Sequence, residues 1–332
     1  MAQALQLEVL DLRHFTANSL RPVLEEESRV WSQRLRWDYR SSADLLLQYL
    51  DSRVLPGYVA VENGRVAGYV FCVYEDTKAV IGDVFAITPR NSATSAHDIE
   101  SRLLVHLIEL LQNSPGVDRI ESQLLLHPHG EHSDVFRHNG FDLYRRLFME
   151  LDLERGLNPA ILDGHAIPMP PGTVLRPWAE SDFTAAGRLI SDAYSGHLDS
   201  HINNQYRSVS GSLRFLHNIV RFPGCGVFDP ASSRVIAYRN SDEIAALLLC
   251  SRVRDDVGHV TQICVARPLR GKGYGRLLLK HCAGELQHRG FKALTLTVTE
   301  ENANAVALYR ASGFEDRHSF DAMVWDRHAH RT

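Results

Sequence analysis

The chain has 332 residues, of which 44% are hydrophobic and 23% are charged, and its formal net charge is −4 at pH 7. This composition is that of a globular protein of about two domains, and it excludes a disordered or collagen-like chain. The slightly acidic balance argues against a nucleic-acid binder, so no nucleic acid is expected as a partner.

The cysteines and the N-terminus indicate a reducing compartment. The five cysteines are odd in number and form no CxxC pair, which is typical of reduced thiols. The first ten residues lack the basic and apolar regions of a signal peptide. Apolar runs such as 244–250 are far shorter than the ~20 residues that span a bilayer. We therefore expect a cytoplasmic protein without a membrane partner, and either a monomer or a homodimer.

The N-terminal half is predicted to alternate strands with helices. The elements expected there are strands at 57–62, 66–74 and 80–87, a helix over 99–110, a strand at 119–126 and a short helix at 134–138. The segment 157–172 carries four prolines in sixteen residues and no sustained period, so it is predicted to be a linker. It divides the chain into domains 1–156 and 173–332.

The C-terminal half is predicted to repeat this order. The elements expected there are a strand at 173–176, helices at 182–194 and 210–221, strands at 234–239, 244–253 and 259–265, a glycine-rich turn at 268–275, a helix at 276–289, a strand at 293–299, a helix at 304–312 and final strands within 314–325. Each half closes with a Gly-Phe pair, at 140–141 and 313–314, followed by Met149 and Met323 respectively. Because the repeat is too long for a solenoid unit, it indicates two copies of one domain.

A glycine-rich turn in the second half predicts a phosphate site. Arg270-Gly271-Lys272-Gly273-Tyr274-Gly275 stands between a strand and a helix. Glycines let successive main-chain N–H groups converge, and the helix start adds partial positive charge. A P-loop would need Ser or Thr after Gly-Lys, and a dinucleotide fingerprint would need GxGxxG, so neither fits. Plain turn chemistry remains the alternative.

A second motif follows one helix and one strand later, in VTEENANAVALYRASGF at 298–314. Together, R-x-x-G-x-G and V-x-x-x-N-x-x-A-x-x-L-Y-x-x-x-G-F resemble the GCN5-related N-acetyltransferase (GNAT) superfamily over roughly 173–325. The N-terminal half resembles the family more weakly, as a degenerate copy in a tandem member. The resemblance implies an α/β fold of two tandem domains, each a twisted mixed sheet flanked by helices, with acetyl-CoA in a V-shaped gap between two strands.

The resemblance also implies roles for particular residues. Those expected to bind the cofactor are Ile263, Cys264, Val265, Arg270, Gly271, Lys272, Gly273, Tyr274, Gly275, Arg276 and Asn302. Tyr309 matches the general acid that protonates the leaving thiolate, the alternative being a tyrosine packed on its helix. His259 is a candidate for the base, against a strand-start histidine without a role or a chain of water molecules. No metal is expected.

The N-terminal half lacks the corresponding functions. No glycine follows Pro89, Phe136 stands at the position of Tyr309, and His129 stands at that of Asn302. This half is therefore not expected to bind acetyl-CoA in the family manner. The histidines of HPHGEH at 127–132 do not have the spacing of a helical zinc site, and a solvated loop is the preferred interpretation.

The expected function is transfer of an acetyl group from acetyl-CoA to a primary amine of a small molecule or peptide, in the C-terminal domain. A non-catalytic acyl-CoA-binding or sensing module is the alternative. A tandem enzyme that uses charged tRNA is a third possibility, but such enzymes generally do not need the glycine cradle.

Overall fold

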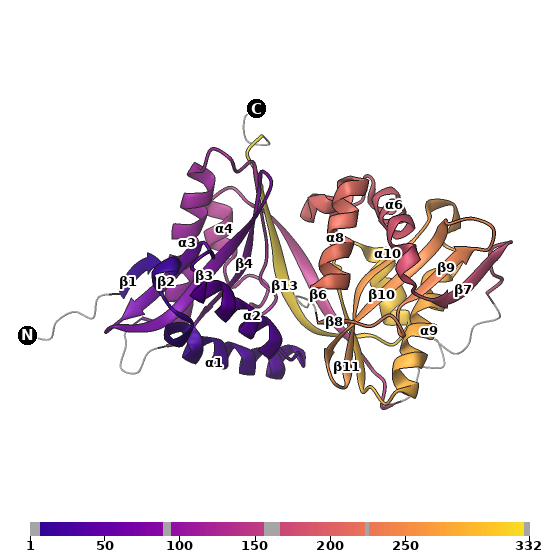
Figure 1. Cartoon of the computed structure of the whole chain (residues 1–332), viewed down its shortest axis with the longest axis horizontal. Coiled ribbons are helices and arrows are strands. Elements are labelled where there is room, and N and C mark those ends of the chain that lie inside the picture. Colours follow the sequence, from indigo (N-terminus) through magenta and orange to yellow (C-terminus); the bar gives the residue numbers. More distant parts are fainter. Residues whose placement is uncertain (1–6, 89–93, 156–166, 223–225, 329–332) are drawn as a thin grey trace, which may run out of the picture. The chain divides into compact units, whose positions relative to one another are not determined.

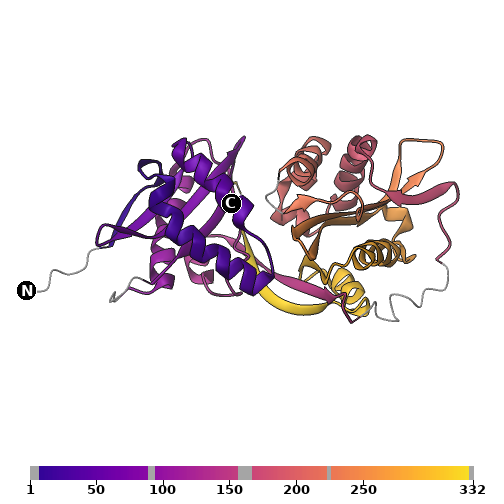
Figure 2. The same cartoon turned by 60° about the horizontal axis from the view of Figure 1, so that its bottom comes forward.

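The structure of the protein, a computed structural model, describes residues 7–88, 94–155, 167–222 and 226–328. The chain forms two compact units. The N-terminal unit comprises the chain up to Arg145 together with the residues from Ser319 onward, and the C-terminal unit runs from Arg146 to His318. Each unit is a sheet with helices packed on it (Figures 1 and 2), so the expected mixed α/β architecture is confirmed.

The sheet of the N-terminal unit has the strand order β1-β2-β3-β4-β5-β13, in which only β4 and β5 are parallel neighbours. Its strands are β1 (Leu7–Asp11), β2 (Gly57–Glu62), β3 (Arg65–Glu75), β4 (Lys78–Ala86), β5 (Arg119–Gln123) and the end of β13 (Glu315–Asp326). Its α-helices are α1 (Ala17–Leu35), α2 (Arg40–Asp51), α3 (Ala96–Asn113) and α4 (Ser133–His138). Successive residues of β3 face opposite sides of the sheet. Tyr69 bonds to Glu27 of α1, whereas Val70 packs in the core that α3 covers.

The sheet of the C-terminal unit has the order β6-β12-β11-β10-β9-β7, with β8 paired to β10, and only β11 and β12 are parallel. Its strands are the end of β6 (Asp142–Asp152), β7 (Thr173–Pro177), β8 (Val227–Phe228), β9 (Arg234–Tyr238), β10 (Ile244–Arg254), β11 (Val257–Val265) and β12 (Ala293–Thr299). Its α-helices are α6 (Phe183–Tyr194), α7 (Asp199–Ile202), α8 (Val209–Arg221), α9 (Tyr274–His288) and α10 (Ala303–Ala311).

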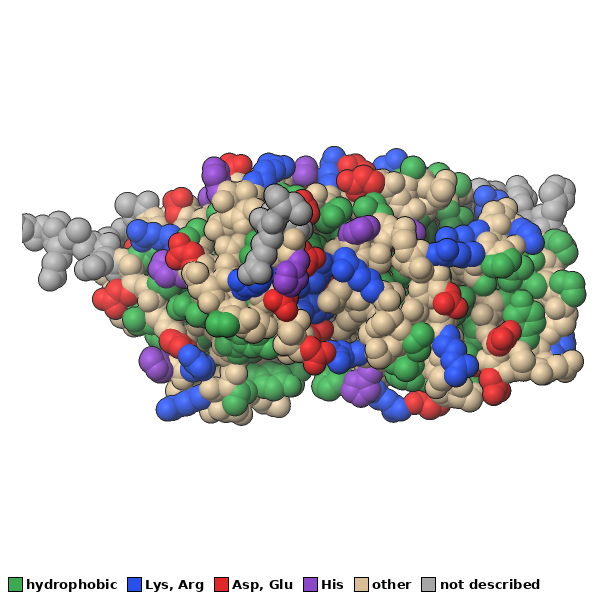
Figure 3. Space-filling model, turned by 90° about the horizontal axis from the view of Figure 1, so that it is seen from above, with side chains coloured by type: hydrophobic (Ala, Val, Ile, Leu, Met, Phe, Trp, Pro, Cys, Tyr) green, Lys and Arg blue, Asp and Glu red, His purple; other side chains and the backbone are tan. Residues whose placement is uncertain are grey.

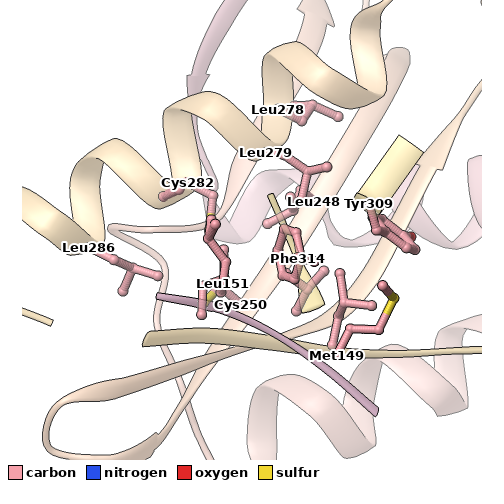
Figure 4. Close-up of a cluster of buried hydrophobic side chains, with 14 of the residues drawn as sticks. Met149, Leu151, Leu248, Cys250, Leu278, Leu279, Cys282, Leu286, Tyr309 and Phe314 are labelled. Atoms are coloured by element: carbon pink, nitrogen blue, oxygen red, sulfur yellow. The ribbon is translucent and has the colours of Figure 1, made fainter. Parts of the chain in front are cut away.

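Two apolar clusters cover the two faces of β10. Leu248 and Cys250 point toward α9, whose Leu278, Cys282 and Leu286 form the apolar stripe that the sequence predicts (Figure 4). The intervening residues of β10 pack in a second cluster with α6 and α8. Because both faces are covered, β10 is one long apolar run rather than an alternating one. The glycine-rich turn and α10 are held on this rigid base.

The two units differ from the contiguous domains 1–156 and 173–332 that the sequence predicts. The end of β6 pairs with β12 in the C-terminal unit, and the end of β13 pairs with β5 in the N-terminal unit. Each unit therefore takes one strand from the other half of the sequence. Met149 lies in the core of the C-terminal unit, and Met323 lies in that of the N-terminal unit. Of the predicted linker, residues 157–166 lie outside the described residues.

The expectation about the cysteines can be followed in the structure. The described cysteines, Cys72, Cys250, Cys264 and Cys282, are buried free thiols, as expected; Cys225 lies outside the described residues. Apart from this, acidic and basic side chains lie interspersed on the face shown in Figure 3, a distribution that the sequence does not predict.

Candidate active site

The strands β11 and β12 separate partway along their length. β12 pairs with β11 only from Val257 to Val260, whereas β10 stays paired with β11 as far as Val265. The last five residues of β11 therefore have one edge that β12 does not occupy. A gap of this kind is what the resemblance implies.

Main-chain groups of Ile263 and Val265 face this gap. The Ile263 N–H donates to Oε1 of Gln262 at 3.2 Å, and its carbonyl accepts from the Tyr194 hydroxyl at 3.4 Å. The Val265 carbonyl accepts from Nε of Arg270 at 3.2 Å, whereas the next N–H, that of Ala266, donates to β10. The main-chain groups of successive residues point to opposite edges of a strand. Of the three predicted residues of β11, Ile263 and Val265 therefore present their main chain to the gap, and Cys264 does not.

Cys264 does not fit the role expected for its main chain. By the same alternation its main-chain groups face β10 rather than the gap. Its side chain is buried against α6 and α8, and burial raises the pKa of the thiol to about 12. Cys264 is therefore a core residue, and its thiol stays protonated at neutral pH.

Two of the three glycines of the turn are required by backbone conformation. Gly271 and Gly273 have φ angles of 75° and 87°, in the left-handed region that side chains disfavour. Gly273 is the residue before α9, so the N–H groups of the first turn of that helix have no partner within the helix. Gly275 serves packing instead, because a Cβ there would lie 3.1 Å from Cδ2 of Leu308 on α10. The turn thus presents free amides at a helix start, as an anion site does.

The cations of the turn divide into two kinds. Arg270 donates to the carbonyl of Ala193 at 2.6 Å, and Arg267 donates to that of Ser195, so both tie the turn to the end of α6. Nε of Arg276 is buried and has no hydrogen-bond partner among the described residues, and Lys272 is exposed. Arg276 and Lys272 therefore have charge available for an anion.

Two further predicted cofactor residues have structural roles. The Tyr274 side chain is buried and its hydroxyl donates to the Pro168 carbonyl at 3.1 Å, which leaves only its main-chain N–H for a ligand. Asn302 caps α10, since its Oδ1 accepts from the Ala305 N–H at 3.3 Å. Its Nδ2 lies 3.4 Å from Nε2 of His197, so the cap also borders the polar cluster described next.

Sequence reasoning missed a polar cluster beside the gap. Asp199, the first residue of α7, accepts a hydrogen bond from Oγ1 of Thr299 at 2.5 Å, at the end of β12. Nδ1 of His197 accepts from the Asp199 N–H at 3.1 Å, which ties the ring to the start of α7. The only signal in the sequence is the polar run His197-Leu198-Asp199-Ser200-His201, which no periodicity connects to β12.

Tyr309 is buried on α10, where its ring lies 5.9 Å from that of Phe314 (Figure 4). Its hydroxyl makes no hydrogen bond to any residue that the structure describes. Burial raises the pKa of Tyr309, and the negative charge of Asp199 raises it further. The side chain is therefore a protonated phenol at neutral pH, and it is close enough to Asp199 to sense its charge.

His259 lies where β11 and β12 are still paired, opposite Thr295, and not at the gap. Its Nδ1 is 2.9 Å from Oγ1 of Thr295, and its ring stacks 6.1 Å from Phe148. Burial, together with the charge of Arg146, lowers its pKa to about 3. A buried imidazole of this kind neither reaches the gap nor accepts a proton at neutral pH, so the geometry speaks against His259 as the base.

Comparisons with known proteins agree with this geometry. The model of the Acetyltransferase (GNAT) family matches residues 198–314. Over 75 residues the chain is 37% identical to the [Ribosomal protein bS18]-alanine N-acetyltransferase of Salmonella typhimurium, and the match covers 23% of this chain and 50% of that protein. The chain thus spans about half the length of this relative.

Solved structures are similar over nearly the whole chain. A GCN5-related N-acetyltransferase from Sphaerobacter thermophilus has a TM-score of 0.63 at 16% identity, with 98% of this chain and 97% of that chain covered. A tandem GNAT protein from the clavulanic acid biosynthesis pathway has a TM-score of 0.59 at 15% identity, with 97% and 99% covered. These likenesses concern the fold. No helix among the described residues is long and apolar enough to cross a membrane.

Proposed function

The chain belongs to the GNAT acetyltransferase superfamily by its residues 198–314, and on that premise we propose that its C-terminal unit transfers the acetyl group of acetyl-CoA to a primary amine. The observation that carries the proposal is the end of β11. There, main-chain groups facing a gap stand beside a glycine turn, and β12 on the other side of the gap ends at Thr299, whose hydroxyl bonds to Asp199, the carboxylate that acts on Tyr309.

Acetyl-CoA binding follows from the β11 edge and the turn. The amides at the start of α9, with Lys272 and Arg276, hold the pyrophosphate. The N–H groups of Ile263 and Val265 bind the pantetheine and the thioester carbonyl, after Gln262 releases the Ile263 N–H. A donor aimed at the developing oxyanion is worth roughly 10²–10³ in rate.

Asp199 replaces His259 as the group that receives the amine. Its carboxylate lies at the end of β12, and its charge acts on Tyr309. A carboxylate there pairs with the incoming ammonium group and takes its proton, directly or through water. The neutral amine then forms the C–N bond to the thioester carbon.

Tyr309 completes the reaction. As the tetrahedral intermediate collapses, the C–S bond breaks and the electron pair goes to sulfur. The phenol donates its proton to the departing thiolate. The second proton of the attacking nitrogen, which is lost as the amide forms, restores the phenol through water, and the proton taken by Asp199 leaves to solvent. The acceptor is a small-molecule or peptide amine, and this polar cluster is where its ammonium group binds.

The proposal is tested by measuring acetyl-CoA binding by calorimetry and CoA release by a thiol reagent, with a panel of primary amines. Asp199→Asn keeps the size of the side chain and removes its charge, so we expect acetyl-CoA affinity to stay and kcat/KM for the amine to fall by ~10²–10⁴. Asp192→Asn, on the exposed side of α6, is the matched control and keeps wild-type rates.

The outcomes separate the proposal from its alternative. Saturable acetyl-CoA binding without CoA release for any amine in the panel would favour an acyl-CoA-binding module. An absence of binding would overturn both. Equal rates for Asp199→Asn and wild type would leave the transferase but remove Asp199 from its mechanism.

A further inference from the structure

A cavity of about 1030 Å³ lies in the N-terminal unit, and no residue of the proposed acetyl-CoA site lines it. Its wall is formed by α1, the turn between β2 and β3, the end of β4, the start of α3 and the loop after β5. Among the lining side chains are His97, Glu100, His127 and Glu131. The loop that contributes His127 is the HPHGEH segment, which the sequence suggests is solvated.

That expectation is wrong for two of its histidines. His127 and His132 are 7% and 5% exposed, and Glu100 of α3, at 5%, is buried with them. Oε2 of Glu100 lies 3.2 Å from Nε2 of His132 and 3.8 Å from Nδ1 of His127. One donor atom from each of the three residues lies within 4.8 Å of the other two. In a tetrahedral site with bonds of ~2.0–2.2 Å, ligand atoms are separated by roughly 3.3–3.5 Å, so small side-chain shifts would close a coordination shell.

His127 and Glu100 each have a second polar atom that points away from the cluster, and in both residues this atom is bonded to the main chain. Nε2 of His127 donates to the Val84 carbonyl at 2.9 Å, so Nδ1 is the ring atom that faces Glu100, and a bound ion would take the place of a proton on it. Oε1 of Glu100 accepts from the Ala86 N–H at 2.9 Å, which leaves Oε2 for the cluster. Metal-binding histidines characteristically donate their second N–H to a carbonyl in this way.

His132 has an unpartnered polar atom. Its Nδ1 is buried and makes no hydrogen bond to any described residue. Its ring stacks on that of His97 at 4.9 Å and meets that of His127 edge-on at 4.8 Å. The two histidines and the glutamate thus face one another with their neighbours already packed around them.

Another buried acid lies near these ligands. Asp83 is 6% exposed and acts electrostatically on His127. It lies against Glu27 of α1, which is 0% exposed and accepts a hydrogen bond from the Tyr69 hydroxyl. These two acids are held by each other and by Tyr69, so they stand outside the proposed ligand set.

We propose that the N-terminal unit binds one divalent transition-metal ion of the zinc type through Oε2 of Glu100, Nδ1 of His127 and Nε2 of His132. Imidazole and carboxylate are donors that suit Zn²⁺. The fourth position faces the cavity, where Glu131 lies with its Oε2 3.3 Å from Nδ1 of His127. It is taken by Glu131, by water or by a ligand that enters the cavity.

Metal binding is measured on the full chain after treatment with a chelator and its removal. Titration with Co²⁺, followed by its d–d absorption, and with Zn²⁺, followed by calorimetry, is expected to show one saturable site per chain. Glu100→Gln and His132→Gln are expected to weaken binding by at least ~100-fold each, because each removes one of three protein ligands. X-ray absorption of the zinc-loaded wild type is expected to show two imidazole ligands.

His129→Gln is the matched control, since it lies in the same loop and is bonded to Asp321 outside the cluster. It should bind metal as the wild type does, which separates the site from adventitious binding by the 17 histidines of the chain. The proposal is overturned if the wild type has no saturable site, if both ligand variants bind unchanged, or if the absorption spectrum shows no imidazole. The spectrum and the titration use the wild type, so they decide even if a variant fails to fold.

Discussion

The end of β11 in the C-terminal unit and the end of β4 in the N-terminal unit occupy matching places in two similar sheets. If Pro268 is aligned with Pro89, Ile263 matches Val84 and Val265 matches Ala86. In β11 the main-chain groups of this pair face the gap; Gln262 and Tyr194 are bonded to Ile263, and Arg270 is bonded to the Val265 carbonyl, but no side chain is bonded to the Val265 N–H among the described residues. In β4 the same positions are engaged by side chains, since His127 binds the Val84 carbonyl and Glu100 binds the Ala86 N–H.

The helices that follow these strands, α9 and α3, also differ in whether the amides at their N-terminus are already bonded to a side chain. α9 starts after Gly273, which has a left-handed conformation and makes no side-chain cap to the first amides of the helix. α3 starts after Ser95, whose Oγ accepts from the Asp98 N–H at 3.1 Å, while Asp98 accepts from the Ser95 N–H at 3.3 Å. This capping box already places a carboxylate where a phosphate would bind.

The short helices nevertheless end in the same turn. The Phe314 N–H donates to the Tyr309 carbonyl at 3.0 Å, and the Phe141 N–H donates to the Phe136 carbonyl at 3.1 Å. This agreement supports the sequence match of Phe136 with Tyr309. The comparison teaches that main-chain geometry preserves the fold in both units, whereas a few side chains decide whether the gap admits a ligand.

The largest expected effect comes from the hydroxyl that distinguishes Tyr309 from Phe136. Tyr309→Phe should lower kcat by ~10²–10⁴, because the thiolate would leave without a proton donor. Acetyl-CoA affinity should stay within about twofold, as measured by calorimetry. The exposed Tyr49→Phe of α2 serves as the control. If kcat of Tyr309→Phe were unchanged, the Tyr309 hydroxyl would have no part in catalysis, and α10 and α4 would not differ in function at this position.

The next effect tests the glycine turn. Gly273→Glu places a side chain at φ 87° and a negative charge at the start of α9, and we expect acetyl-CoA affinity to fall on the order of 10²-fold. Gly64→Glu is matched, since Gly64 has φ 72° in a turn of the N-terminal unit and free space around its Cβ position. It should cost stability but leave affinity unchanged. Equal affinities for the two variants would show that the turn is not a phosphate site.

His259 is expected to affect stability rather than catalysis. Its pKa is about 3 in the folded chain and near 6.5 when exposed, so below pH 6.5 the unfolded chain binds a proton that the folded chain does not. Its contribution is therefore intact above pH 6.5 and is lost as the pH falls toward 3, by about 2 kcal/mol between pH 7 and pH 5.

The variant His259→Asn should be less sensitive to acid by this amount while keeping kcat near the wild-type value. Hydrogen exchange of the β10–β12 amides at the two pH values measures the first effect, and CoA release measures the second. A loss of kcat of ~10² or more would restore His259 as a candidate base. Equal acid sensitivity of variant and wild type would contradict the lowered pKa.

Some of these features could be predicted from the sequence, and others could not. The turn at 270–275 and Tyr309 could be proposed from the sequence because the chemistry of glycine and the motif spacing are local. α1 was missed because the buried Glu27 interrupts its apolar stripe, between Leu24 and Trp31. Asp199 and the cluster around Glu100 were missed because their partners are distant in sequence. The exchange of β6 and β13 was missed because pairing partners leave no periodic signal in either strand.

The smallest expected effect concerns the capping box of α3. Ser95→Ala removes the hydrogen bond to the Asp98 N–H and should lower the stability of the N-terminal unit by about 1 kcal/mol. Three of the four tryptophans, Trp31, Trp37 and Trp325, belong to this unit, so denaturant unfolding followed by fluorescence reports mainly on it. Acetyl-CoA affinity should not change, because the helix start that binds phosphate is that of α9. If affinity fell with Ser95→Ala, the N-terminal unit would contribute to cofactor binding. The contrast between a filled gap and an open gap would then no longer explain where acetyl-CoA binds.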